Sequence, residues 1–207
     1  MDNKKHSLPV KEILNDYRLG WRSRIASTIG RKEVLTGKAS FGIFGDGIEL
    51  PQLAMAKAFQ KGDFRSGYYR DQTVELALGQ LTVAEFFSQL YADANVQNEP
   101  NSGGRQMNCH FASRLLNEQG QFKNLLSTTN TAADISPTAG QMSKLVGLAY
   151  ASKLFRNNTE LHQFSTLSNK GNEVVFGSIG DASTSEGAFF EAMNAAGVLQ
   201  VPLVMSV

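Results

Sequence analysis

The last 35 residues of this 207-residue chain read as a strand, a helix and a second strand. Apolar runs at 173–179 and 201–207 flank a helical pattern over about 184–199. Two strands joined through a helix of this length form a βαβ unit, in which the strands lie parallel. Together with the helical segments before it, this unit predicts an α/β fold with a parallel sheet flanked by helices.

The run VPLVMSV at 201–207 predicts a strand buried on both faces. Natural termini are usually polar or frayed, so we interpret the chain as part of a longer protein, truncated at the C-terminus. The segment 1–44 is predicted to be an N-terminal helical extension. Residues 45–207 are predicted to be a partial α/β domain.

Apolar periodicity predicts four helices before the βαβ unit, at about 10–28, 48–59, 82–91 and 137–155. Thr82 and Glu85 have the spacing of a capping box. Ser136 is a predicted N-cap for the fourth helix. That helix should bury Met142, Leu145, Val146 and Ala149. The first helix carries an apolar stripe, predicted to be core or a partner interface, made of Ile13, Leu14, Tyr17, Trp21 and Ile25.

The composition excludes several classes of protein. Lys plus Arg number 20 and Asp plus Glu 19, so nothing indicates a nucleic-acid or membrane-surface partner. Cys109 is the single cysteine, so no disulfide can form within the chain. The start is polar, unlike a signal peptide, and no apolar run approaches the roughly 18 residues of a membrane span. We expect a soluble, cytoplasmic protein.

Asp181 directly follows the predicted strand at 173–179. Ligands of open parallel sheets bind beyond the carboxyl ends of the strands. Ser183 and Glu186 have the spacing of a second capping box, so a helix should begin beside the acid. A carboxylate near a phosphate-binding helix start needs a cation between the two, and Mg²⁺ fits that need. The alternative is that Asp181 only caps the turn.

Four stretches resemble one family in the right order. They are YRD at 69–71, GRQM at 104–107 followed by His110, the helix at 135–153, and GDASTSEG at 180–187. The chain from about 45 to 207 resembles the α subunit of the thiamine diphosphate-dependent 2-oxo acid dehydrogenase E1 component, of the pyruvate and branched-chain type. This resemblance implies a thiamine diphosphate-binding fold.

The resemblance assigns roles to individual residues. Asp181 would bind Mg²⁺, and Arg70 would hold the cofactor's diphosphate. The full set of implied cofactor contacts is Tyr69, Arg70, Ser136, Thr138, Gly180, Asp181, Ala182 and Ser183. Tyr68 could take the place of Tyr69. His110 is a weak candidate for lining the substrate channel.

Two departures limit the resemblance. Branched-chain members bind potassium partly through a threonine, and the matching position here is Gly140. The second protein ligand of Mg²⁺ and the family's active-site histidine loop would both lie beyond Val207. Cys109 and His110 are neighbours in the chain, but this single pair does not provide the set of ligands that a metal ion needs.

The implied function is decarboxylation of a 2-oxo acid on thiamine diphosphate, with transfer of the acyl group to a lipoyl-bearing E2 partner. An E1 β subunit or β half would complete the site, and the protein would be oligomeric. The 207 residues alone would be inactive. The alternatives are acetoin dehydrogenase or another thiamine diphosphate enzyme, and a non-catalytic assembly module. The sequence does not decide which 2-oxo acid is used. It also does not decide whether the parent protein is a separate α subunit or an α–β fusion.

Overall fold

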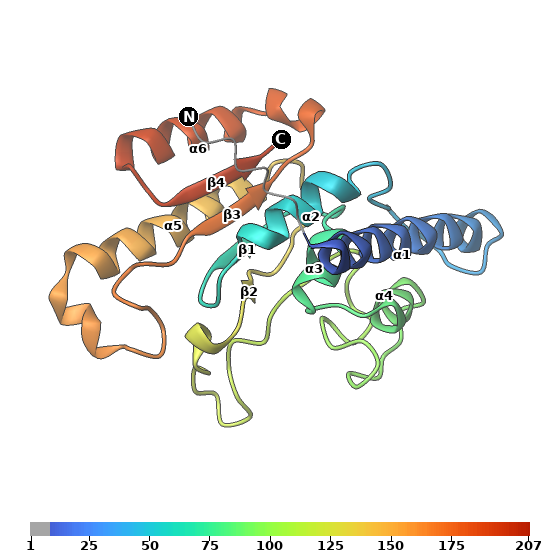
Figure 1. Ribbon diagram of the computed structural model, residues 1–207, viewed down its shortest axis with the longest axis horizontal. Helices are drawn as coiled ribbons and strands as arrows, with labels where there is room; N and C mark the ends of the chain where they lie inside the picture. Colours follow the sequence, from blue (N-terminus) through green and yellow to red (C-terminus); the bar gives the residue numbers. More distant parts are fainter. Residues whose placement is uncertain (1–8) are drawn as a thin grey trace.

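The computed structural model describes residues 9–207, which form a parallel sheet with helices on both faces (Figure 1). The strands are β1 (Phe64–Ser66), β2 (Asn130–Thr131), β3 (Val175–Ser178) and β4 (Leu203–Ser206). All neighbours pair in parallel, in the order β2-β1-β3-β4. The predicted α/β class with a parallel sheet flanked by helices is therefore confirmed.

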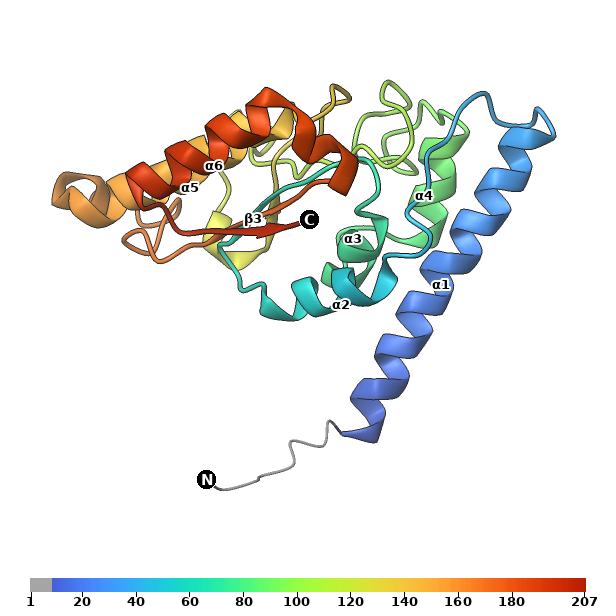
Figure 2. The same cartoon turned by 90° about the horizontal axis from the view of Figure 1, so that it is seen from above.

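Six α-helices lie within residues 9–207. They are α1 (Val10–Leu35), α2 (Glu49–Ala58), α3 (Gln72–Leu78), α4 (Val83–Leu90), α5 (Gln141–Asn157) and α6 (Gly187–Leu199). Figure 2 shows α5 and α6 on one side of the sheet, and α2 and α3 on the other. Within residues 9–207 no helix is long and apolar enough to cross a bilayer.

The core between α5 and the sheet confirms the predicted buried stripe. Met142, Leu145, Val146 and Ala149 are all buried against β3 and α6. Gly177 of β3 lets α5 approach closely, because a Cβ there would overlap the Leu145 side chain. On the opposite face, Phe59 at the end of α2 stacks on Phe176, with ring centroids 4.0 Å apart.

The two predicted capping boxes have different outcomes. At α4 the Glu85 N–H donates to Thr82 Oγ1 at 3.2 Å, and the Thr82 N–H donates to Glu85 Oε2 at 2.7 Å. The second box does not form. Ser183 lies within a 3₁₀ turn, η3 (Asp181–Ser185), and α6 begins only at Gly187. The hydroxyls of this turn bond back to its own carbonyls, as Thr184 does to Asp181, so the chain tightens before the helix starts.

The apolar stripe of α1 is not core within this chain. Tyr17 is 66% exposed and Trp21 55% exposed. The buried residues of α1 are small: Ser23, Ala26, Ser27 and Gly30. They allow close packing, since a Cβ at Gly30 would lie 2.5 Å from the Phe44 ring. The partner-interface alternative for the stripe stays a prediction.

The prediction for 201–207 is wrong in its burial. β4 lies at one edge of the described sheet and pairs only with β3 there, so its residues are half-buried and Val204 is 44% exposed. The division at residue 45 stays a prediction, and residues 1–8 of the predicted extension lie outside the described part.

Candidate cofactor site at the carboxyl end of the sheet

The strand order changes direction between β1 and β3, where Tyr68, Asp71 and Ser178 help to line a small crevice. After β1 the chain passes to β2 on one side, and β3 then pairs with β1 on the other side. In open α/β sheets this change of direction is where ligands bind, beyond the carboxyl ends of the strands. Two predicted site segments follow these strands directly, at 67–71 after β1 and at 179–183 after β3.

The structure brings these two segments together. A Cβ built on Gly180 would lie 3.8 Å from Cε2 of Tyr68 and 4.0 Å from its hydroxyl. Tyr68, rather than Tyr69, is therefore the tyrosine beside Gly180. Burial raises the pKa of Tyr68 to about 12, and the charge of Asp71 adds to this effect. Its hydroxyl is thus a proton donor at neutral pH.

Arg70 is exposed, four residues beyond the end of β1, and lines a pocket beside Arg31 and Asp46. Its guanidinium carbon lies 5.7 Å from the Tyr69 ring centroid, and it forms no ion pair among residues 9–207. Its backbone is fixed, because the Gln52 side-chain amide donates to the Arg70 carbonyl at 2.9 Å. The guanidinium itself has no hydrogen-bond partner in the described structure, and a planar guanidinium of this kind is well suited to binding an oxyanion.

Asp181 is also exposed, at the start of η3. Its carboxylate accepts no hydrogen bond and forms no ion pair within the described residues, whereas its backbone carbonyl accepts from Thr184 Oγ1 at 2.6 Å. The alternative in which this side chain caps the turn therefore has no support in the contacts. Ala182 is exposed and Ser183 half-buried in the same turn.

Beneath the crevice lies a charged cluster that sequence reasoning missed, here called the Arg65 network. It consists of Arg65, Asp71, Glu75 and Asp134, all buried. Arg65 Nε donates to Asp71 Oδ2 at 2.9 Å, and Arg65 Nη2 donates to Asp134 Oδ2 at 3.0 Å. Arg65 Nη1 lies 3.2 Å from Glu75 Oε1.

The Arg65 network fixes the segments that carry the candidate residues. Asp71 follows Tyr69 and Arg70, and it accepts hydrogen bonds from the Tyr68 N–H at 3.2 Å and from the Ser178 hydroxyl at the end of β3. Asp134 precedes the segment of Ser136 and Thr138. Gly67 leaves room for the Asp71 carboxylate, since a Cβ at this position would overlap it.

Two of the carboxyl groups around this guanidinium, Glu75 and Asp71, have a raised pKa. Burial raises the pKa of Glu75 to about 7, although Arg65 acts in the opposite direction. Burial also raises the pKa of Asp71. Burial alone would lower the pKa of Arg65, but attraction by Asp134, Asp71 and Glu75 outweighs it and the net shift is upward. One oxygen of Asp134, Oδ1, is buried without a hydrogen-bond partner.

Ser136 has a different role from the predicted N-cap. α5 begins at Gln141, and residues 138–140 form a turn in which Ala139 has φ of 57°. The Ser136 hydroxyl instead lies 2.9 Å from His110 Nε2. The other ring nitrogen lies 3.2 Å from the Asn108 carbonyl, which favours a proton on Nδ1 and an accepting Nε2. His110 is buried, so its ring does not face open solvent.

The groups present fit a diphosphate and a hard cation. They combine a free guanidinium, a tyrosine hydroxyl donor and a free carboxylate. No group of three or more His, Cys, Asp or Glu in the described chain could hold a metal by itself. A cation at Asp181 would therefore take most of its ligands from phosphate or water, as Mg²⁺ commonly does. Thr138 is exposed, and no hydrogen bond in the described chain brings its side chain to the crevice.

An open parallel sheet whose strand order changes direction between β1 and β3 defines an α/β protein of the kind that binds ligands beyond the carboxyl ends of its strands. The family model described as "Dehydrogenase E1 component" matches residues 17–207, so the chain belongs to this family.

Curated relatives agree with this assignment. The chain is 32% identical over 170 residues to the 2-oxoisovalerate dehydrogenase subunit alpha of Bacillus subtilis, covering 82% of this chain and 42% of the relative. It is 30% identical over 169 residues to subunit alpha 1 of the mitochondrial enzyme of Arabidopsis thaliana, covering 81% and 29%. The mouse mitochondrial subunit alpha is 27% identical over 197 residues, covering 95% and 37%. The chain thus spans less than half the length of these relatives.

Proposed function

We propose that this chain forms the diphosphate-binding part of a branched-chain-type 2-oxo acid dehydrogenase E1 component. The relatives' names and the family assignment support this class. The proposal rests on one observation: the Arg70 guanidinium and the Asp181 carboxylate, which follow neighbouring strands, have no side-chain partner within residues 9–207. Arg70 and Tyr68 would bind diphosphate oxygens, and Asp181 would bind Mg²⁺.

Thiamine diphosphate, when bound, acts as an electron sink for decarboxylation of a 2-oxo acid. The residues of this chain would hold and orient that group. An E1 β subunit or β half and a lipoyl-bearing E2 are the proposed partners. Because this chain supplies binding groups, we expect the 207 residues alone to release no CO₂ from a 2-oxo acid. Substrate profiling of the protein that carries the chain would distinguish 2-oxo acids from acetoin.

Calorimetry with thiamine diphosphate tests the proposal in the protein that carries this chain. Asp181→Ala should weaken binding in Mg²⁺ by at least about tenfold, because a charge-assisted contact is lost. In EDTA the variant and the wild type should bind alike. Arg70→Gln should weaken binding in both conditions, since its contact is to phosphate itself.

Glu118→Ala is the matched control, because Glu118 is an exposed acid in a turn remote from the crevice along the chain. It should bind the cofactor as the wild type does. Full Mg²⁺-dependent affinity in Asp181→Ala would overturn the proposal.

A further inference from the structure

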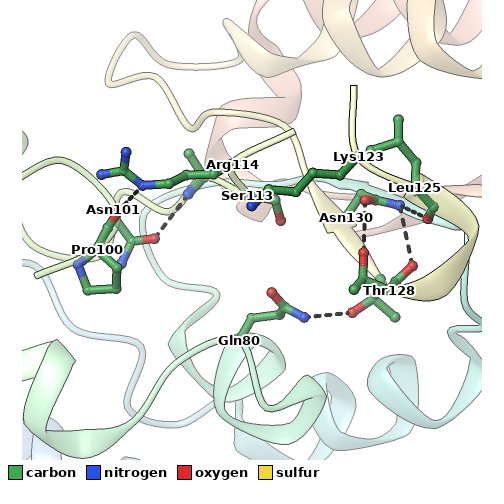
Figure 3. A pocket seen from close by; sticks show the side chains of 11 residues that line it. Gln80, Pro100, Asn101, Ser113, Arg114, Lys123, Leu125, Thr128 and Asn130 are labelled. Atoms are coloured by element: carbon green, nitrogen blue, oxygen red, sulfur yellow. Dashed lines mark hydrogen bonds between the residues drawn. The ribbon is translucent and has the colours of Figure 1, made fainter. Parts of the chain in front are cut away.

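A cavity of about 240 Å³ lies against β2, among four segments of the chain (Figure 3). Its polar side chains include Gln80, Asn101, Ser113, Arg114, Lys123 and Asn130. Asn130 is the first residue of β2 and pairs with Phe64, the first residue of β1. The candidate cofactor residues instead follow the last residues of β1, β2 and β3, and none of them lines this cavity. The cavity is therefore a separate site.

A hairpin places two cations on this cavity. Arg114 and Lys123 lie on its two arms, which are joined by a bridge between Leu116 and Phe122. The Asn117 side chain holds the turn by accepting from the Gln121 N–H at 2.9 Å. No carboxylate lines the cavity, and neither cation forms an ion pair among residues 9–207. Two cations that line one cavity without a carboxylate favour an anion there.

The side chains of the cavity have more free donors than acceptors. Asn101 Oδ1 accepts from the Ala112 N–H at 3.2 Å, but Asn101 Nδ2 is buried without a partner. Ser113 Oγ accepts from the Thr131 N–H at 2.8 Å, which leaves its proton to donate. Arg114 uses only Nε, donating to the Pro100 carbonyl at 3.2 Å, so its terminal nitrogens are free in the described structure.

Lys123 adds a further donor, and Figure 3 shows it extending toward Ser113 across the cavity. Its ammonium group has no hydrogen-bond partner within the described residues, whereas its backbone N–H donates to the Leu115 carbonyl at 2.9 Å. Gln80 Nε2 is occupied by Thr129 Oγ1 at 3.2 Å, so its Oε1 is a free acceptor. The free donors of this set favour an anionic ligand that is rich in oxygen.

We propose that this cavity binds a small oxyanion of the phosphate type. A tetrahedral phosphate presents several acceptor oxygens, and arginine and lysine are its usual partners. A buried amide donor without a partner is unusual in a native protein and indicates a missing acceptor. The cavity has room for a phosphate and a few further heavy atoms, since a water in the liquid takes about 30 Å³.

The test measures the chemical reactivity of Lys123 in the protein that carries this chain. The rate of Lys123 acetylation is measured by mass spectrometry with and without about 10 mM inorganic phosphate, which nearly saturates a site with a Kd near 1 mM. Phosphate should slow acetylation of Lys123 about tenfold. Lys170, which does not line the cavity, should react at the same rate in both conditions. Sulfate should protect as phosphate does, and acetate less.

Variants separate this cavity from the cofactor site. Asn101→Asp keeps the acceptor for the Ala112 N–H but replaces the free donor with an anionic oxygen, so protection should be lost. Arg114→Gln, at an exposed position, should reduce protection without affecting the fold. Asn172→Asp, an equal change at an exposed residue outside the cavity, should leave protection intact.

Arg70→Gln should also retain protection, which shows that the effect does not depend on the proposed cofactor site. The proposal is overturned by an unprotected Lys123 in the wild-type protein, or by equal protection in Asn101→Asp.

Discussion

The Arg65 network and the Asp181 turn lie at the same end of the sheet, but the charges of the first are buried and paired, whereas the charge of the second is exposed. Arg65 is fully buried among three carboxyl groups, and its Nε, Nη1 and Nη2 all face oxygens within 3.3 Å. Asp181 is exposed and has no partner for its side chain in the described structure. The first arrangement is complete within the chain and stabilises it. The second offers a free charge to a ligand.

This difference separates charges that hold the site from charges that bind the ligand. Asp71 directly follows Arg70 in the chain, yet its carboxylate points into the protein, to Arg65 and Ser178. Arg70 itself is exposed. Two neighbouring residues of one motif therefore have different physical roles, and substitutions should affect different measurements.

The largest effect is expected from Arg65→Met. The change removes the only cation from a buried cluster of three carboxyl groups, which leaves buried charge without compensation. The free energy of unfolding should fall by about 3–5 kcal/mol. Urea denaturation of the protein that carries this chain measures it. Arg18→Met, at an exposed arginine of α1, is the control and should change little. A loss as small as the control's would mean that the network contributes no net stability.

Glu75→Gln should change the pH dependence of stability. The pKa of Glu75 is raised to about 7, so the folded protein holds a proton there that the unfolded chain releases near pH 4.5. Stability from this group is present below pH 4.5 and is lost as pH rises toward 7. The amide mimics the protonated acid, so the variant should not show this loss of stability with rising pH. In the wild type the total loss amounts to about 3 kcal/mol of unfolding free energy.

Urea denaturation at pH 5 and pH 8 measures the difference. Relative to the wild type, Glu75→Gln should be more stable at pH 8 than at pH 5. Glu118→Gln, at an exposed acid, should follow the wild-type profile. Parallel profiles for the wild type and Glu75→Gln would show that Glu75 is ionised in the folded protein at both pH values.

The smallest effect on stability is expected from Asp181→Ala. Its carboxylate has no partner in the described chain, so the free energy of unfolding without ligand should change by less than about 0.5 kcal/mol. The same variant should lose Mg²⁺-dependent cofactor binding. A large loss of stability in the absence of ligand would place Asp181 with the Arg65 network, as a structural charge.

Much of the candidate site was accessible from sequence because its signals are local. Asp181 follows an apolar run and lies at the carboxyl end of β3, as expected. The Y-R-D stretch follows β1, a strand that the sequence did not predict, because residues 61–67 read as a polar turn. The Arg65 network was not accessible in this way. Arg65 is a single charge in the three-residue strand β1 and reads as an exposed position. Its partners lie up to 69 residues away along the chain, at Asp134.

Local preference also explains where the fold was predicted well. The Thr82 capping box and the buried stripe of α5 depend on residues three or four apart, and both formed. The second box failed because Ser183 lies within a 3₁₀ turn that ends before α6 begins. Ser136 failed as a cap because packing placed His110 beside it.

By itself the sequence determined the class of fold, the βαβ unit at its end, the helices with clear apolar periodicity and the place of Asp181, because helix periods, caps and strand ends are short-range properties. Only the tertiary structure decided which charges are buried together, which face of α1 is exposed, and that Asn101, Arg114 and Lys123 surround one cavity. Those outcomes depend on contacts between segments distant in the chain, and they are set by packing and desolvation rather than by local preference.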